Sequence, residues 1–446
     1  MLNILYLYNS TQTYTNVVYE HLSALGKYSE HRSFFLHQDV TTELNVDLSK
    51  FDAVAIHFSI RLPFDQISSS VALGLAHFQG LKFLFIQDEY DFTSRAWEWI
   101  NRLGIQLVFT VVPSEGIARV YPESQFPRTR FVTNLTGYVP EEVVQKHGDR
   151  IIPPSQRPLW VGYRGRPLPI RYGKLGVEKV AIGEIVKNYC IEHQIEHDIA
   201  WTEESRIYGP EWYEFMTSCR SMLGSESGSN VFDWDGTLDC RIQEYRENHP
   251  GVTDLQIYEV MVRPREIDGI MNQVSPRIFE AIAARTVLVL FEGNYSGVVK
   301  PDEHFIALKK DGSNLAQVMS LLQDDQYIDD MVERVYQDVI ASGKYSYQTF
   351  VKCVDEEISI SAISMKIHPF NTIEPKLVNT TGSFLTTDPI RALPPQPPTN
   401  TFSNTLFGAH GVKDFFSRLL IYFWGRLPES TRDSIRPTIK QILGRG

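Results

Sequence analysis

The chain of 446 residues has few cysteines, no excess of positive charge and no long apolar run, and each absence excludes a class of protein. Its four cysteines are too few and too scattered for a disulfide framework or a paired-cysteine zinc site. No apolar run approaches the roughly 18–20 residues that cross a membrane. The N-terminus also lacks the basic segment of a secretory signal. We therefore expect a cytoplasmic protein.

The charge is acidic overall and unevenly distributed. There are 54 Asp and Glu residues against 43 Lys and Arg, which gives a formal net charge of −11. This balance argues against a general nucleic-acid binder, which carries a basic footprint, so we expect no nucleic-acid partner. Residues 413–445 differ, with seven basic and three acidic side chains. An acidic body is therefore joined to a basic tail.

The first 375 residues alternate short apolar runs with helical patterns, and the length suits two or three domains. Strands are predicted at 3–8, 53–58, 82–86, 106–112, 159–163, 198–201, 221–223, 287–291 and 306–308. Helices are predicted at 15–25, 68–79, 95–103, 179–192, 275–284 and 315–341. This alternation favours an α/β fold with parallel sheets covered on both faces. We expect two Rossmann-like domains facing a cleft, at 1–150 and 151–375, the second ending in a helix that crosses back to the first.

Two further segments follow the α/β body. Residues 376–410 are rich in Pro, Thr, Ser and Asn, which is typical of a flexible, extended linker. Residues 411–446 place aromatic and apolar side chains beside Arg418 and Arg426, which predicts a basic amphipathic helix. Such a helix suits peripheral association with the anionic inner face of a membrane. Docking on the core or on a partner chain fits equally well, and both interpretations stay open.

Residues 275–293 are the most informative stretch of the sequence. Ser275 is a good N-cap and Pro276 a good first helical residue, so a helix begins here. Its N-terminus directs partial positive charge at an anion, with Arg277 beside it. Glu280, one turn further on, is placed to accept hydrogen bonds from ribose hydroxyls. The strand that follows ends near 291, and ligands collect at the carboxyl ends of parallel strands.

This helix-then-strand phrase resembles the donor-site segment of GT-B-fold glycosyltransferases, whose usual form is Phe-Glu-Ala-x-Ala-x-Gly-x-x-x-Val. Residues 279–284 read PheGluAlaIleAlaAla, with Arg285 where Gly is usual. The similarity is greatest to group-1-like transferases of bacterial polysaccharide clusters and to CgeB-like spore-maturation proteins. The segments at 162–166 (GYRGR) and 87–90 (QDEY) also match, in the donor-diphosphate turn and at the end of an N-terminal strand.

The resemblance covers about residues 1–350. It implies a nucleotide-sugar donor as co-substrate, no further cofactor, no metal, and a glycan or lipid-linked acceptor. Departure of a nucleoside diphosphate builds negative charge on phosphate oxygens, which arginines and a helix N-terminus stabilise. The residues expected to bind the donor are Arg164, Gly165, Arg166, Lys174, Glu226, Ser227, Asn272, Ser275, Arg277 and Glu280.

One position departs from the family pattern. Retaining members carry Glu-x7-Glu, with the second Glu at the position of Glu280, and Asn272 stands where the first is usual. The sugar-contacting carboxylate is therefore missing or supplied from elsewhere, and retention or inversion stays open. An inverting mechanism needs a base from the N-terminal domain. The candidates, all at predicted strand ends, are His57, Asp88 and Glu89.

Two alternative functions remain. The absence of a Glu at position 272 leaves room for a non-catalytic nucleotide- or sugar-binding protein of the same fold. Asp233-Trp-Asp235-Gly-Thr matches the nucleophile loop of haloacid-dehalogenase-type phosphatases, which use Mg²⁺. That chemistry requires a hydrophobic strand before the loop, and only Val231 and Phe232 precede it here. The sequence therefore favours the transferase.

Overall fold

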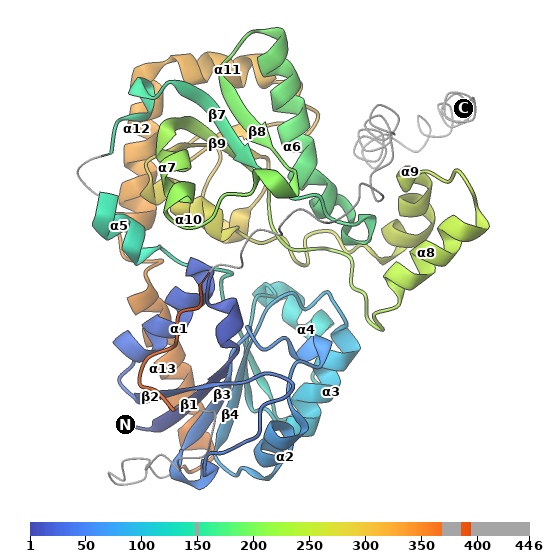
Figure 1. Ribbon diagram of the computed structural model, residues 1–446, viewed down its shortest axis with the longest axis vertical. Coiled ribbons are helices and arrows are strands. Elements are labelled where there is room, and N and C mark those ends of the chain that lie inside the picture. Colours follow the sequence, from blue (N-terminus) through green and yellow to red (C-terminus); the bar gives the residue numbers. More distant parts are fainter. Residues whose placement is uncertain (148–150, 368–384, 394–446) are drawn as a thin grey trace.

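The computed structural model describes residues 1–147, 151–367 and 385–393. It has two Rossmann-like domains, one above the other in Figure 1, which confirms the predicted α/β class. Each domain contains one all-parallel sheet, with strand order β2-β1-β3-β4-β5-β6 in the first and β11-β10-β9-β7-β8 in the second.

The N-terminal domain contains β1 (Asn3–Tyr8), α1 (Asn16–Tyr28), β2 (Arg32–His37), β3 (Ala53–Ile56), α2 (Ser69–His77), β4 (Leu81–Ile86), α3 (Thr93–Leu103), β5 (Leu107–Thr110), α4 (Ile117–Val120), β6 (Arg130–Thr133) and α5 (Glu141–His147). The sequence predicted four of these strands. It missed β2 and β6, which lie at the two edges of the sheet and mix polar with apolar side chains. Edge strands bury less surface, so their apolar pattern is weaker.

The second domain contains β7 (Leu159–Arg164), α6 (Gly173–Glu192), β8 (His197–Ala200), α7 (Pro210–Ser218), β9 (Cys219–Gly224), α8 (Leu238–Asn248), α9 (Asp254–Ile257), α10 (Pro276–Ala283), β10 (Val287–Phe291), β11 (Ile306–Leu308), α11 (Leu315–Gln323) and α12 (Asp325–Val335). Every strand predicted for this domain is present. The central strand β10 is a continuous apolar run, and β9 is also buried although it contains Arg220 and Ser221, as expected for a parallel sheet covered on both faces.

Helix α13 (Tyr347–Ser364) leaves the second domain and packs on the N-terminal sheet beside α1 (Figure 1). Its buried face belongs to the same apolar cluster as Tyr6 and Phe83 of that sheet. Phe350 lies 4.5 Å from the ring of Tyr138 and 4.7 Å from that of His21, measured between ring centroids. The chain therefore completes its first domain with its last described helix.

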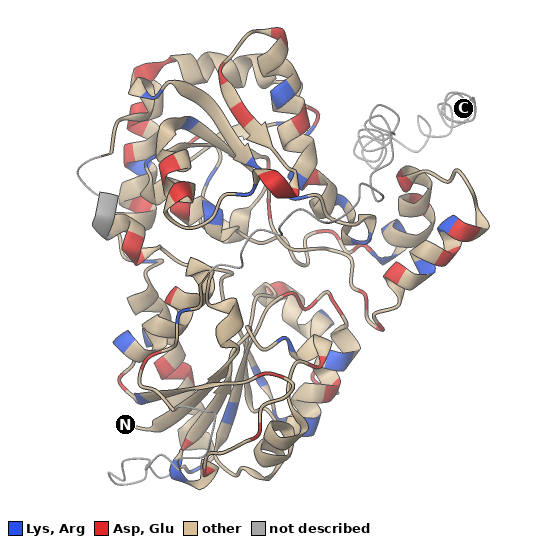
Figure 2. Cartoon of the chain, in the orientation of Figure 1, with Lys and Arg blue, Asp and Glu red and all other residues tan. Residues whose placement is uncertain are grey.

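A second connection between the domains lies in the segment from β9 to α10. Helices α8 and α9 stand off the second domain, and α8 carries both charge signs along its length (Figures 1 and 2). The loops that flank these helices contribute Phe232, Ile270 and Met271 to the core of the N-terminal domain. Trp234 also packs edge-on against Trp97, with ring centroids 5.4 Å apart. The two domains share one apolar core on this side.

Residues 385–393 also pack on the N-terminal domain. Thr386 pairs antiparallel with Phe35 of the edge strand β2. The amide of Ile390 donates to the hydroxyl of Tyr8 at 2.8 Å, and the hydroxyl of Thr13 donates to the Ile390 carbonyl at 2.8 Å. This part of the expected flexible linker at 376–410 is therefore a docked segment, because the edge strand supplies partners for its backbone. The predicted tail helix at 411–446 lies outside the described residues. Among the helices that the structure describes, none has the length and apolarity to cross a membrane.

The packing of α13 generates a stability prediction. Replacing Phe350 by Ala leaves a cavity beneath the helix, and we expect the free energy of unfolding to fall by about 3–5 kcal/mol. Ile363 on the same helix is 77% exposed, so Ile363→Ala should change it by less than about 0.5 kcal/mol. Chemical denaturation of both variants checks this. Equal stability of the two variants would contradict the packing role of α13.

Candidate functional site

A cleft of about 710 Å³ lies between the two domains. Its wall is built from segments that follow the carboxyl ends of β1, β3 and β4 in the first domain and of β7 and β9 in the second, and from the start of α10. The carboxyl ends of parallel strands are where α/β proteins bind ligands. The structure thus brings this edge of both sheets to one cavity.

Five basic side chains line this cleft: Arg61, Arg164, Arg166, Lys179 and Arg277. Arg164 is paired with a carboxylate of its own domain: its guanidinium binds both carboxylate oxygens of Asp198, at 2.8 and 2.6 Å. Arg166 and Arg277 are exposed, and within the described part of the chain neither has a carboxylate partner within 4.0 Å. Arg277 donates to the carbonyl of Arg164 and lies over the ring of Trp212, 5.2 Å from its centroid.

Sequence reasoning missed Lys179. Its Nζ atom lies 3.4 Å from both the Glu226 carbonyl and the Ser227 hydroxyl. Burial, helped by the nearby Arg277, lowers the pKa of Lys179 to about 8. A basic residue within an amphipathic helix looks like ordinary surface charge, and only the fold turns this side chain into the cleft. Lys174, which the sequence suggested instead, is not on the wall; its Nζ lies 3.3 Å from Asp268.

Helix α10 begins at the cleft, as its sequence predicted. Ser275 and Arg277 line the wall. Glu280 lies behind them: it is 9% exposed, and its Oε2 atom accepts a hydrogen bond of 2.9 Å from the indole nitrogen of Trp212. Burial raises its pKa. The structure therefore places Glu280 against Trp212, which lines the cleft, and its contact with a ribose stays a prediction.

Glu226 and Asn272 meet in a buried network away from the cleft wall. The Oε2 atom of Glu226 accepts from the side-chain amide of Asn272 at 2.5 Å, and its Oε1 atom accepts from the backbone amides of Asn294 and Tyr295 at 3.0 and 2.9 Å. These bonds join the loops that follow β9 and β10. Ser227, one residue on, does line the cleft. Gly165 is not on the wall; a Cβ atom there would lie only 2.8 Å from the Lys179 carbonyl.

The three candidate bases occupy different environments. His57 is fully buried, with ring nitrogens 3.0 Å from His21 Nδ1 and from the Ser59 hydroxyl. Burial holds the pKa of His57 well below its ordinary value. Glu89 is also fully buried, and its Oε1 atom accepts from the Thr110 hydroxyl and from the Val111 amide. Neither of the two buried candidates is part of the cleft wall.

Asp88 is exposed and lines the cleft. It has a left-handed backbone, with φ of 58°, and its carboxylate accepts a hydrogen bond of 2.6 Å from the Tyr90 hydroxyl. Asp88 also borders two smaller hollows, of about 350 and 170 Å³. The wall of the larger hollow contains no charged side chain other than Asp88, and its polar residues are Thr15, Gln87, Thr136, Ser227 and Gln273, together with Tyr90. The carboxylate thus stands where a cationic cleft meets an uncharged hollow.

The phosphatase-like segment forms a cap for α8. The two carboxylate oxygens of Asp233 accept from the amide of Leu238, each at 3.2 Å. Asp235 accepts from the Thr237 amide at 3.1 Å. No strand leads directly into the segment in the described chain: β9 ends at Gly224, and Val231 makes only an isolated bridge. Within residues 1–147, 151–367 and 385–393, no three His, Cys, Asp or Glu side chains gather to hold a metal ion.

Comparisons with known proteins give structural likeness alone. No protein-family model and no curated protein matches the sequence. Among solved structures, an alpha-glucosyltransferase in complex with UDP and a 13-mer DNA is similar at 9% identity and a TM-score of 0.49, over 80% of this chain and 99% of that one. The sucrose-phosphate synthase of Thermosynechococcus elongatus has 10% identity, a TM-score of 0.43, and coverage of 82% and 100%. Anabaena HepE in complex with UDP-glucose has 10% identity, a TM-score of 0.40, and coverage of 82% and 100%.

The buried Glu89 generates a prediction about pH. Burial raises its pKa to about 7, so the folded protein binds a proton there that the unfolded chain releases nearer pH 4.5. The contribution of this bound proton to the free energy of unfolding is complete below pH 4.5. It is lost as the pH rises to about 7, by at most about 1.4 kcal/mol per pH unit. Glu89→Gln removes this dependence. The stability of the variant relative to wild type should therefore increase between pH 5 and 7.

Thermal unfolding of both proteins across that range measures the effect. Glu115→Gln, which changes an exposed carboxylate, is the control and should track the wild type throughout. A constant difference between Glu89→Gln and wild type from pH 5 to 7 would contradict the raised pKa.

Proposed function

We propose that this protein is a glycosyltransferase that moves a sugar from a nucleotide-sugar donor to a glycan or lipid-linked acceptor. One observation carries the proposal: the cleft between the two Rossmann-like domains has a cationic wall on the second domain and an exposed carboxylate, Asp88, on the first. Such a site binds a diphosphate leaving group on one side and an attacking hydroxyl on the other.

The diphosphate of the donor fits the second-domain side of the cleft. Arg166, Arg277 and Lys179 supply positive charge, and the N-terminus of α10 adds its partial charge and amide donors. These groups stabilise the negative charge that develops on the leaving diphosphate. We propose that they do so without a metal ion. The ring of Trp212, held by Glu280, provides an apolar surface for the nucleoside.

The transferred sugar, a hexose or deoxyhexose, fits between the diphosphate and Asp88. In the proposed reaction the acceptor hydroxyl oxygen attacks the anomeric carbon, and the bond from that carbon to the diphosphate oxygen breaks. The hydroxyl proton passes to the Asp88 carboxylate, and the bond electrons leave with the diphosphate. The hydrogen bond from Tyr90 fixes the orientation of this carboxylate.

We place this reaction in the synthesis of bacterial surface polysaccharide or another glycoconjugate in the cytoplasm, with the tail at 411–446 holding the enzyme at the inner face of the membrane. The basic, aromatic composition of the tail supports that proposal.

A non-catalytic binding protein is the second candidate, and one observation favours it. Asn272 takes the place of a catalytic-site Glu, and the nearest carboxylate, Glu226, is buried and fully hydrogen-bonded. Binding of UDP, GDP, TDP or CMP is common to both functions. Turnover of the corresponding sugar nucleotide, with release of the nucleoside diphosphate or, from a CMP-sugar, of CMP, distinguishes the enzyme from the binding protein.

A substitution at Lys179 tests whether the donor diphosphate binds on the second-domain side of the cleft. Lys179→Met removes a charge-assisted contact to the diphosphate, so the dissociation constant of the preferred nucleotide should rise about 10–100-fold. Lys187 lies two turns along α6 and binds the Ile199 carbonyl at 3.2 Å, so Lys187→Met is the matched control and should leave affinity unchanged. Isothermal calorimetry measures both. Equal affinity in the two variants would remove Lys179 from the donor site.

A substitution at Asp88 tests whether this carboxylate accepts the proton in the chemical step. Asp88→Asn keeps the shape of the side chain but removes the proton acceptor, so kcat should fall by about 10²–10⁴ while nucleotide affinity is retained. Asp65 is also an N-terminal-domain aspartate with a left-handed backbone, and it pairs with Arg95 on the surface. Asp65→Asn should keep wild-type kcat. A fully active Asp88→Asn variant would exclude Asp88 as the base.

A further inference from the structure

The loop that carries Asp88 is held by the second domain as well as by its own. It runs from residue 87 to residue 92, between β4 and α3. The amide of Asp233 donates to the Tyr90 carbonyl at 2.8 Å, and the amide of Ser94 donates to the Trp234 carbonyl at 2.9 Å. Both partners belong to the segment before α8, so the backbone is tied across the domain boundary within the loop and just after it.

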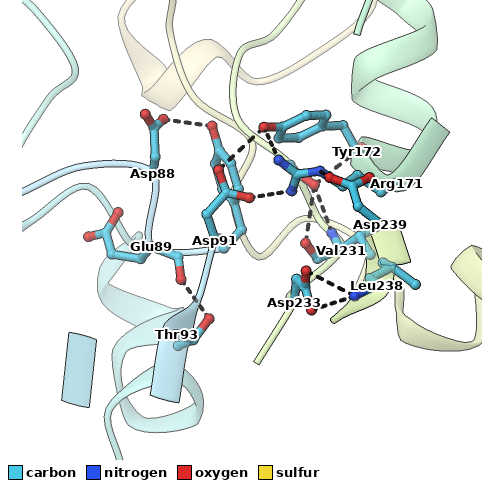
Figure 3. A network of polar contacts seen from close by, with 12 residues as sticks. Asp88, Glu89, Asp91, Thr93, Arg171, Tyr172, Val231, Asp233, Leu238 and Asp239 are labelled. Carbon is cyan, nitrogen blue, oxygen red and sulfur yellow. Dashed lines mark hydrogen bonds and ion pairs between the residues drawn. The ribbon is translucent and has the colours of Figure 1, made fainter. Parts of the chain in front are cut away.

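An ion pair between the domains anchors the middle of this loop (Figure 3). Arg171, just before α6, binds Asp91 through Nη1, and the two side chains are only 13% and 3% exposed. Its Nε atom lies 2.6 Å from Asp239 of α8. The neighbouring Tyr172 hydroxyl also donates to Asp91, at 3.3 Å. One guanidinium thus joins the loop, the start of α6 and the start of α8.

Short contacts connect Asp91 to Asp88. The amide of Asp91 donates to the Asp88 carbonyl at 3.0 Å, which closes the turn. The Tyr90 hydroxyl donates to the Asp88 carboxylate, and the Tyr90 ring packs edge-on against Tyr172 at 5.8 Å. Asp88 and Phe92 both have left-handed backbones, with φ of 58° and 51°. Such conformations are uncommon for residues other than glycine, especially for a bulky one such as Phe92, which indicates that the surroundings hold this turn.

From these contacts we propose that Arg171 is a positioning residue: by holding Asp91 from the second domain, it fixes the turn that aims Asp88 into the cleft. This inference rests on the proposed function, since it assigns Asp88 the acceptor proton. Its consequence is specific. The base, although it belongs to the first domain, is correctly oriented only while the donor-binding domain is joined to its loop. Activation of the acceptor hydroxyl then depends on an arginine of the donor-binding domain.

The test uses the full chain and four variants. Arg171→Met leaves Asp91 buried without its partner, which also weakens the fold. The double variant Arg171→Met/Asp91→Asn removes both charges, so folding is restored without the anchor. Arg171→Lys keeps a cation within reach of Asp91 but loses the planar fork. Arg241→Met is the matched control, because Arg241 pairs with Asp235 at 3.0 Å on the same segment and both side chains are about half exposed.

We expect Arg171→Met and the double variant to lose about 100-fold in kcat, with KM for the donor within about twofold of wild type, because a small displacement of a reacting group is costly. Arg171→Lys should recover part of kcat, and Arg241→Met all of it. If the arginine mattered only for stability, the double variant would regain wild-type kcat. That result, or wild-type kcat in a folded Arg171→Met variant, would overturn the proposal.

Hydrogen exchange provides a readout that does not depend on the reaction. The amides of Asp91 and Ser94 should exchange about 10-fold or more faster in the double variant than in Arg241→Met, because their hydrogen-bonded turn is released. Unchanged protection of both amides would overturn the positioning role even if no donor were turned over. Absence of turnover in the wild type, with the exchange difference present, would count against the proposed function and leave the positioning of Asp88 supported.

Discussion

The structure depends on how two parallel sheets are held with their carboxyl edges facing each other. A ligand site between such sheets exists only while the separation between the two edges is maintained. Here two separate connections maintain it: α13 packs on the N-terminal sheet, and the loops around α8 and α9 place Phe232 and Met271 in the N-terminal core. Burial of these side chains is worth about 1.5–3 kcal/mol each. The two connections belong to separate apolar clusters of the N-terminal domain.

The acidic side chains near the cleft form two groups, buried ones that hold its walls together and an exposed one at the cavity. Glu226 joins two loops of the second domain, Glu280 holds Trp212, and Glu89 accepts bonds from the end of β5. Each is buried, and each is used to build the wall behind the cleft. Asp88 and Asp91 both line the cavity, but Asp91 is buried and paired with Arg171, whereas Asp88 is exposed and has a backbone that most residues avoid. The site therefore combines buried acids that maintain shape with one exposed acid suited to proton transfer.

Sequence patterns predicted the fold well, because most central strands of a buried parallel sheet are largely apolar and stand out in the sequence, whereas the mixed edge strands β2 and β6 do not. They also placed Arg166, Ser227, Ser275 and Arg277 at the cleft, since residues that follow strands or begin helices can be located from local rules. They did not separate His57 from Asp88, because both follow strands of the same sheet. Whether such a side chain turns into the core or into the cavity depends on φ at one residue and on packing from the other domain.

Lys179 and Lys174, both on α6, also show that sequence patterns do not predict which side chain points into the cleft. The two differ by five positions, which is more than one turn, so they point in different directions from the α6 axis. Only the packing of α6 decides which of them meets the cleft, and that packing is set by contacts of residues far away in sequence, such as Ser227 and Glu226. The partial loss of solvation that lowers the pKa of Lys179 follows from the same placement. A basic residue in the helix can be found from sequence, whereas its electrostatic role arises only when two strand edges, one helix and a second domain enclose it.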